Sequence, residues 1–301
     1  MRYTLRQLEV FLAVARHESV SRAAKDLAMS QSAVSGSLND LEQAFDVRLF
    51  ERVGKRLRLN DLGRAFRPHA EALWDQAREL ENVIENRAGA TPLRVGATLS
   101  IGNYLMAPLL ARFRREEPAI RVGLEVFNTE EIVRRVHNFE IDIGLVEGEV
   151  QGQDLRVTRW CDDELYVFCA PWHPLAKKRA LDEEDLKKAA WIVRERGSGT
   201  RQAFEHAMHG LLPELDISLE LQHTEAIKSA VKAGLGVGCV SRVALVDELE
   251  FGSLVRCRVP GRDFRRAFYF VLHQDKFQGP ALKSWLNFCV RSVKGAPKAR
   301  A

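Results

Sequence analysis

Short polar side chains that could read DNA bases gather in the segment that begins at Ser30. Apolar residues recur there at helical spacing and predict a helix over residues 31–45, one face of which carries Val34, Leu38, Leu41 and Phe45. Ser30 is its predicted N-cap. The other face is small and uncharged and consists of Gln31, Ser32, Ser35, Gly36 and Asn39. A solvated face usually carries Lys and Glu, so this composition favours close approach to base edges over the alternative of a plain solvent face.

Basic side chains follow in residues 48–59, where two short alternating segments flank Gly54 and predict a β-hairpin. Five cations face one acid in this stretch. Arg52, Lys55 and Arg56 at the hairpin tip would reach phosphates beside the major groove. Such contacts supply affinity that is independent of sequence and falls with salt.

A second set of candidate groups lies in the C-terminal two thirds, where several predicted helices begin with hydroxyl residues: Ser100, Thr129, Ser198, Thr200 and Thr224. Helix capping is a sufficient explanation for each one taken singly. Several of them directly follow predicted strands, however, and ligands of open α/β sheets bind beyond the carboxyl ends of strands. Their free N–H groups would then converge on a cleft that favours a small anion.

Other chemistries find little support. His206 and His209 lie one helical turn apart without a third ligand nearby in sequence, so no metal site is predicted. A redox pair of Cys161 and Cys169 is disfavoured because Cys169 lies within an apolar run and is predicted to be a buried small hydrophobe. No catalytic or nucleotide-binding motif occurs, so we expect neither enzymatic activity nor a cofactor.

The elements that must position these groups fit a chain of 301 residues, which is long enough for two or three domains. Helices are predicted over residues 5–17 and 20–27, ahead of the polar helix. Residues 1–60 thus form a predicted winged helix-turn-helix. Five cysteines without C-x-x-C spacing, and the absence of a signal-like or membrane-spanning apolar run, predict a cytoplasmic protein.

A long linker helix is predicted over residues 61–87. Its apolar positions alternate at spacings of four and three, as in a coiled-coil seam, and are Phe66, Ala70, Leu73, Ala77, Leu80 and Ile84. Packing of this helix on its own chain stays open as the alternative. Pro68 is expected to bend the helix near its start. Residues 88–92 are small and rich in breakers and predict a hinge.

Residues 93–301 alternate strands and helices, which predicts an α/β fold with parallel strands. The predicted elements include a helix over residues 101–117 and a strand over 165–170. They divide into two lobes joined by crossover strands. Lobe I is expected over about 93–161 and 267–301, and lobe II over about 162–266.

The N-terminal pattern closely resembles that of LysR-type transcriptional regulators. The resemblance rests on residues 8–14, 19–27, 30–35, 41–42 and 47–52, and then extends over nearly the whole chain. It implies that Gln31, Ser32 and Ser35 touch bases or nearby phosphates. It also implies dimerisation through the linker helix, a dimer or tetramer on an inverted-repeat site, and RNA polymerase as a partner. The family commonly has arginine where this chain has Gly36, so less direct guanine reading is expected.

For the C-terminal part the resemblance implies a bilobed domain like that of periplasmic solute-binding proteins. Residues 98–104, 128–130 and 194–201 resemble the family's effector-binding segments. The candidate contacts are therefore Thr98, Ser100, Asn103, Thr129, Ser198, Gly199 and Thr200. Residues 98–104 resemble the branch concerned with sulfur and inorganic carbon, which implies an oxyanion or small carboxylate as effector. Gly197 and Gly199 could equally serve only a turn before a helix.

The leading hypothesis is an effector-responsive, non-enzymatic DNA-binding regulator. Two alternatives remain: a small-molecule binding protein or enzyme whose N-terminal domain mediates assembly, and a regulator whose cleft binds nothing. The sequence leaves open the effector, the operator, the direction of regulation and the choice between dimer and tetramer.

Overall fold

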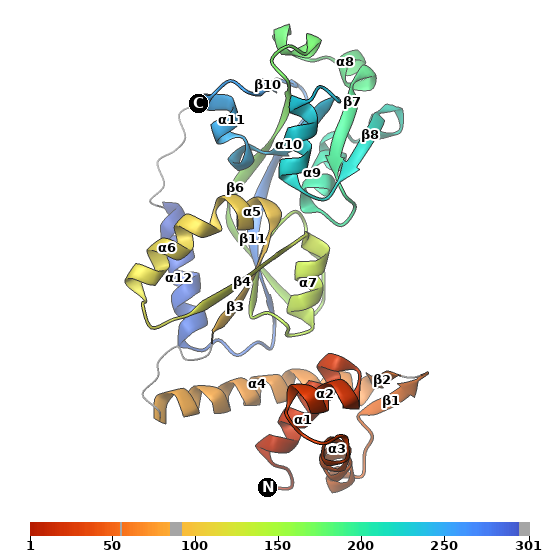
Figure 1. Ribbon diagram of the computed structural model, residues 1–301, viewed down its shortest axis with the longest axis vertical. Helices are drawn as coiled ribbons and strands as arrows, with labels where there is room; N and C mark the ends of the chain where they lie inside the picture. Colours follow the sequence, from red (N-terminus) through yellow and green to blue (C-terminus); the bar gives the residue numbers. More distant parts are fainter. Residues whose placement is uncertain (55, 85–91, 295–301) are drawn as a thin grey trace.

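The computed structural model of the chain describes residues 1–54, 56–84 and 92–294 (Figure 1). Lys55, residues 85–87 at the end of the predicted linker and residues 88–91 of the predicted hinge lie outside these ranges.

Three helices and a hairpin form the N-terminal domain. The helices are α1 (Leu5–His17), α2 (Val20–Asp26) and α3 (Gln31–Phe45), and the hairpin pairs β1 (Phe50–Val53) with β2 (Arg56–Leu59). The hydroxyls of Ser19 and Ser30 accept hydrogen bonds from backbone N–H groups three residues further on, which confirms both predicted caps. All three helices bury their apolar faces in one core around Leu8, Phe11 and Val34.

Glu42 connects α3 to the hairpin. Its side chain is buried on the core side of the helix, where Oε1 accepts a hydrogen bond from the Leu49 backbone N–H at 2.7 Å and Oε2 accepts one from Arg48 at 2.8 Å. A buried N–H must find a partner, and Glu42 supplies it at the point where the chain enters β1.

The long helix α4 (Asp61–Ile84) divides into two halves. In the first half Ala70 is buried, and Phe66 and Leu73 pack against the core of the N-terminal domain. In the second half Leu80 and Ile84 are 60% and 75% exposed. Packing on the same chain, the alternative left open by the sequence, therefore describes the first half. The second half leaves apolar side chains in solvent.

Nine strands within the described residues form one sheet in the order β4-β3-β5-β11-β6-β9-β7-β8, with β10 paired to β6. The strands are β3 (Leu93–Thr98), β4 (Val122–Phe127), β5 (Ile143–Glu147), β6 (Leu155–Cys169), β7 (Ala190–Arg194), β8 (Asp216–Leu221), β9 (Val237–Ser241), β10 (Val255–Cys257) and β11 (Arg265–His273). β3 pairs in parallel with β4 and β5, and β7 with β8 and β9.

Two lobes follow from this order, and β6 and β11 run antiparallel between them (Figure 1). Lobe I holds β3 to β5 with α5 (Leu99–Tyr104), α6 (Met106–Glu116), α7 (Thr129–His137) and α12 (Pro280–Lys294). Lobe II holds β7 to β10 with α8 (Glu183–Lys188), α9 (Gly199–Ala207), α10 (Thr224–Lys232) and α11 (Val246–Glu250). The remaining helices are short 3₁₀ segments over Pro174–Lys177, Leu212–Glu214 and Arg242–Ala244.

Two sequence predictions in this region were wrong. The single helix predicted over 101–117 is two helices, because Pro108 has no N–H to donate to the Tyr104 carbonyl four residues before it. The strand predicted over 165–170 begins ten residues earlier, at Leu155. Its first half is largely exposed and rich in charge, so it shows no apolar alternation.

The linker helix α4 contacts lobe I through charged side chains. Lys276 Nζ lies 2.6 Å from Asp75 of α4 and 2.8 Å from Asp142, which also pairs with Arg94 at 2.7 Å. Burial alone would raise the pKa of Asp142, but Lys276 and Arg94 lower it to about 2. This buried, paired cluster places lobe I against the linker helix.

We expect Glu42→Ala to destabilise the N-terminal domain by about 1–3 kcal/mol, because the Leu49 N–H loses its buried acceptor. Hydrogen exchange of amides in α1 and α3 of the full chain measures this loss locally. Asp40→Ala, at an exposed position of the same helix, is the matched control. Equal protection in the two variants would contradict the anchoring role of Glu42.

Candidate functional site

The exposed face of α3 carries the predicted base-contacting residues. Gln31, Ser32 and Ser35 are exposed and Asn39 is half-buried, whereas Val34 and Leu41 on the opposite face are buried. The Ser30 hydroxyl accepts from the Ala33 N–H at 3.1 Å and lies 2.9 Å from the Ser32 hydroxyl. Packing in the core therefore fixes the position of this helix, while its polar face remains accessible to a DNA groove.

Gly36 leaves space on that face. A Cβ built there would meet nothing within 4 Å, so packing does not require glycine at this position. The small residue instead lets the helix surface approach another surface closely.

The hairpin presents its cations beside α3. Arg52 is exposed, and Arg56 is 64% exposed with its guanidinium 3.6 Å from Glu18. Arg58, which the sequence prediction did not select, also lies 3.7 Å from Glu18. The Leu57 N–H donates to the Glu18 carbonyl at 3.1 Å, so the hairpin is tied to the end of α1. Lys55 lies outside the described residues.

The second candidate site lies between the lobes, where three predicted helix caps need correction. The N-cap positions are Thr98, Asn128 and His223, each ahead of its predicted cap. Ser100, Thr129 and Thr224 lie inside the first turn, and the hydroxyls of Ser100 and Thr129 donate to Glu147 instead. Ser198 is a cap as predicted, since its hydroxyl accepts from the Thr200 N–H at 3.2 Å.

A buried carboxylate, Glu147 at the end of β5, gathers hydroxyls from both lobes. Thr98 and Ser100 of lobe I donate to it, the latter at 3.0 Å, and Thr200 of lobe II donates at 3.2 Å. Glu147 is 1% exposed. The predicted residues thus converge as expected, but on a group supplied by the chain itself, which the sequence prediction did not include.

Arg266 of β11 contacts two of these hydroxyls. Its guanidinium donates to Thr200 Oγ1 at 3.0 Å and to Ser100 Oγ at 3.4 Å. It also pairs with buried Asp163 of β6 at 2.7 Å, and Asp163 accepts from the Ser241 hydroxyl at 2.8 Å. Because the arginine occupies the acceptor side of both hydroxyls, their protons are directed toward Glu147.

The lobes also touch directly beside this network. The Gly199 N–H donates to Thr129 Oγ1 at 3.0 Å, and the Glu130 N–H donates to the Gly197 carbonyl at 3.1 Å. A Cβ on Gly199 would lie 1.9 Å from the Glu147 carbonyl oxygen. Gly199 is therefore required by the close approach of two backbones, whereas Gly197 has the positive φ of the turn, +83°.

A further contact between the lobes joins α5 to α10. The Tyr104 hydroxyl donates to Glu225, and Lys228 lies 2.7 Å from the same carboxylate. Burial raises the pKa of Tyr104, and the hydrogen bond to Glu225 raises it further. Asn103, predicted as an effector contact, is instead exposed on α5, outside the hydroxyl cluster.

Arg194 at the end of β7 supplies a buried cation on the lobe II side. Its guanidinium makes two hydrogen bonds to Glu195, at 2.8 and 2.9 Å. Nη1 is buried without a hydrogen-bond partner among the described residues.

The residues set aside by sequence show no other site. Cys169 is fully buried, as predicted, with its Sγ 3.4 Å from that of Cys257. Among the described residues no three His, Cys, Asp or Glu side chains are grouped so that they could hold a metal ion. No helix in the same residues has the length and apolarity needed to cross a bilayer.

Fold and site together define a class: a winged helix-turn-helix protein with a two-lobed α/β domain whose polar site lies between the lobes. Residues 5–64 match the family described as bacterial regulatory helix-turn-helix proteins of the lysR family, and residues 86–294 match the LysR substrate binding domain. The chain belongs to the LysR family of DNA-binding transcriptional regulators.

Known proteins resemble the chain along most of its length. It is 41% identical to YeiE of Escherichia coli (strain K12), described as an uncharacterized HTH-type transcriptional regulator, over 96% of this chain and 98% of that one. Full-length OxyR from Pseudomonas aeruginosa matches the structure with TM-score 0.73 at 22% identity, covering 96% of this chain and 95% of that chain. The Synechocystis PCC6803 CcmR regulatory domain in complex with 2-PG matches with TM-score 0.64 at 30% identity, covering 69% of this chain and 99% of that chain.

We expect Gly36→Arg to fold normally and to change which DNA sequences are preferred, because it adds a guanidinium that can pair with guanine on the exposed face of α3. Selection from a random DNA library measures the preference. Gln43→Arg adds the same charge at an exposed position two turns further along the helix. If both variants select the wild-type sequences, the recognition face has been misplaced.

Proposed function

We propose that the chain binds an inverted-repeat DNA site as a homodimer or homotetramer and responds to a small anion bound between its lobes. The observation that carries the effector part is the convergence of three hydroxyl donors, from two lobes, on the single carboxylate of Glu147. A site that holds an internal carboxylate in this way has the donors that an oxyanion or small carboxylate needs.

Displacement of Glu147 is the central step of this proposal. The effector anion takes the donors of Thr98, Ser100 and Thr200 when the Glu147 side chain moves away. Buried Arg194 Nη1, which has no hydrogen-bond partner in the described part of the chain, offers an additional donor on the lobe II side. The 2-PG complex of the similar CcmR regulatory domain supports an anionic ligand for this class of domain. Binding then favours one arrangement of the lobes to the extent that the anion prefers it.

A second copy of the chain is the proposed occupant of the exposed end of α4. Leu80, Val83 and Ile84 are 60%, 67% and 75% exposed and lie within two turns. Exposed apolar residues at this spacing fit a helix seam between two copies. Two copies would present two α3 helices to half-sites about one helical turn apart, or a multiple of that. DNA as target favours a cytoplasmic location, with RNA polymerase as a further partner.

The two alternative functions predict different properties of the chain. A binding protein or enzyme with an assembly domain would not need the exposed polar face of α3 or the cations of the hairpin. A constitutive regulator would bind DNA, but no anion would stabilise its interlobe site. The proposed protein catalyses no reaction.

We expect Ile84→Asp to shift the full chain toward monomer, because it places a charge in the proposed apolar seam. Sedimentation velocity at several protein concentrations measures the change. Asn82→Asp, at a half-buried polar position on the side of the helix opposite Leu80 and Ile84, should leave the association unchanged. An unchanged dimer in Ile84→Asp would place the interface elsewhere.

We expect Ser100→Ala to weaken, and Glu147→Gln to strengthen, binding of the effector anion by about tenfold each. The first change removes a donor to a charged group, and the second removes a like charge. Thermal unfolding of the full chain with sulfate, sulfite, thiosulfate, bicarbonate or small carboxylates identifies the anion, since a ligand stabilises by RT ln(1 + [L]/Kd). Calorimetric titration of the variants then gives the affinities.

Ser253→Ala is the control, because its hydroxyl is in lobe II but lies on the surface near Glu248. Weaker binding in Glu147→Gln would mean that the carboxylate accepts a hydrogen bond from the effector, which would exclude displacement. Affinity unchanged in Ser100→Ala would place the anion outside the hydroxyl cluster.

A further inference from the structure

A large cavity lies between the N-terminal domain and lobe I, apart from the interlobe site. Its volume is about 800 Å³. The N-terminal side of the wall comes from the end of α1, the start of α2, strand β2 and the start of α4, and the lobe I side comes from the end of α7 and the segments around Asp154 and His273. In Figure 1 the recognition helix α3 lies on the far side of the N-terminal domain from lobe I. The cavity therefore lies on the other side of the N-terminal domain from α3, although its lining includes Arg56 of the hairpin.

The cavity is rich in arginine. Its lining includes Arg16, Arg22, Arg56, Arg58, Arg64, Arg67 and Arg134, against the four carboxylates of Glu18, Glu140, Asp154 and Asp275. Four of these arginines also have acids outside the lining within 4 Å, since Arg16, Arg64, Arg67 and Arg134 lie near Asp26, Asp61, Glu71 and Glu131. The arginine that remains without an ion pair among the described residues is therefore what distinguishes this wall.

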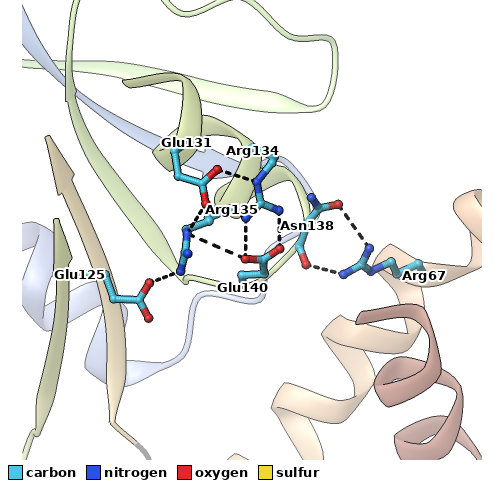
Figure 2. Close-up of polar contacts among 7 residues, drawn as sticks. All are labelled: Arg67, Glu125, Glu131, Arg134, Arg135, Asn138 and Glu140. Carbon is cyan, nitrogen blue, oxygen red and sulfur yellow. Dashed lines mark hydrogen bonds and ion pairs between the residues drawn. The ribbon is translucent and has the colours of Figure 1, made fainter. Parts of the chain in front are cut away.

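Each carboxylate in the cavity wall already lies near an arginine or a histidine. Glu18 serves both Arg56 and Arg58, at 3.6 and 3.7 Å. Glu140 pairs with Arg134 at 2.6 Å, as Figure 2 shows. Asp154 and Asp275 lie 3.8 Å from His137 and His273. Arg22 has no ion-pair partner within residues 1–54, 56–84 and 92–294.

Arg67 provides a second observation that points to a ligand. It reaches from α4 to lobe I and donates through Nη1 and Nη2 to Asn138 (Figure 2). Its Nε is buried and makes no hydrogen bond to any described residue. The nearest acid, Glu71, is 3.8 Å away, and burial raises the pKa of Glu71, which weakens it as a counter-charge. A buried guanidinium with an open donor needs an acceptor.

We propose that this cavity is a second binding site, which takes a small, multiply charged phosphate-type anion bridging the N-terminal domain and lobe I. Guanidiniums suit such a ligand because their planar donors pair with phosphate oxygens two at a time. Since Arg22 and Arg58 belong to one domain and Arg134 to the other, the bound anion holds lobe I against the winged helix. Its affinity is then linked to any rearrangement of these domains on DNA.

Titration of the full chain with inorganic pyrophosphate at constant ionic strength tests the proposal. We expect saturable binding that weakens at least about tenfold in Arg22→Gln and in Arg58→Gln, because each loses a charged donor. Arg159→Gln, which removes an exposed arginine of β6 that does not line the cavity, should bind as the wild type does. Ser100→Ala should also bind pyrophosphate normally, which separates this site from the interlobe site.

Three results would overturn the proposal. They are no saturable binding to the wild-type chain, equal binding by Arg22→Gln, Arg58→Gln and Arg159→Gln, and loss of binding in Ser100→Ala. A fourth measurement distinguishes a free anion from the phosphates of DNA. If a short DNA duplex displaces pyrophosphate in direct competition, DNA occupies the cavity and the small-anion site is excluded. Circular dichroism of each variant checks that it is folded.

Discussion

The two-lobed domain depends on a buried ion pair between Arg266 and Asp163, where β6 and β11 cross from one lobe to the other. Both side chains are almost inaccessible, 4% and 0% exposed. Removing two charges from water costs several kcal/mol per ion, so such a pair is tolerated only when the remaining donors and acceptors are satisfied. Here Ser241 donates to Asp163, while Ser100 and Thr200 accept from Arg266. The pair therefore requires groups from both lobes to meet at one point.

This requirement explains why the interlobe site is polar although it is buried. Once Arg266 occupies the lone pairs of two hydroxyls, their protons need an acceptor, and the Glu147 carboxylate provides it. An ion pair and a series of hydrogen bonds connect Asp163 through Arg266 and the hydroxyls to Glu147. In the proposed exchange an entering anion replaces only the last member, because Asp163 and Arg266 are fixed by the crossing strands. Exchange at Glu147 thus changes the site without breaking the pair that holds the lobes together.

The sequence predicted the local features well and the long-range ones poorly. The helix over 31–45 and its cap at Ser30 follow from periodicity and from one hydroxyl, both of which are local. The N-cap predictions missed by two residues at Ser100 and by one at Thr129 and Thr224, because a hydroxyl residue in the first turn of a helix looks in sequence like one at the cap. Glu147 and Arg266 were missed because their partners lie far along the chain, 103 residues apart for Arg266 and Asp163. The α4 pattern could not separate packing on its own domain from packing on a partner, since both need the same apolar stripe.

Helix α7 connects the interlobe site to the linker helix. At its first residue, Thr129 accepts from Gly199 of lobe II, and just beyond its last residue Asn138 accepts from Arg67 of α4. The nine residues of α7 span about 13 Å at 1.5 Å per residue. Its sides are held by the ion pairs of Arg134 and Arg135 with Glu131, Glu140 and Glu125 (Figure 2). The hydrogen bond from Arg134 lowers the pKa of Glu131 to about 2, so the pairing with Glu131 persists throughout the neutral range. A helix braced in this way moves as a unit, and a shift of the lobes at Thr129 must therefore reach Arg67 and the cavity beside it.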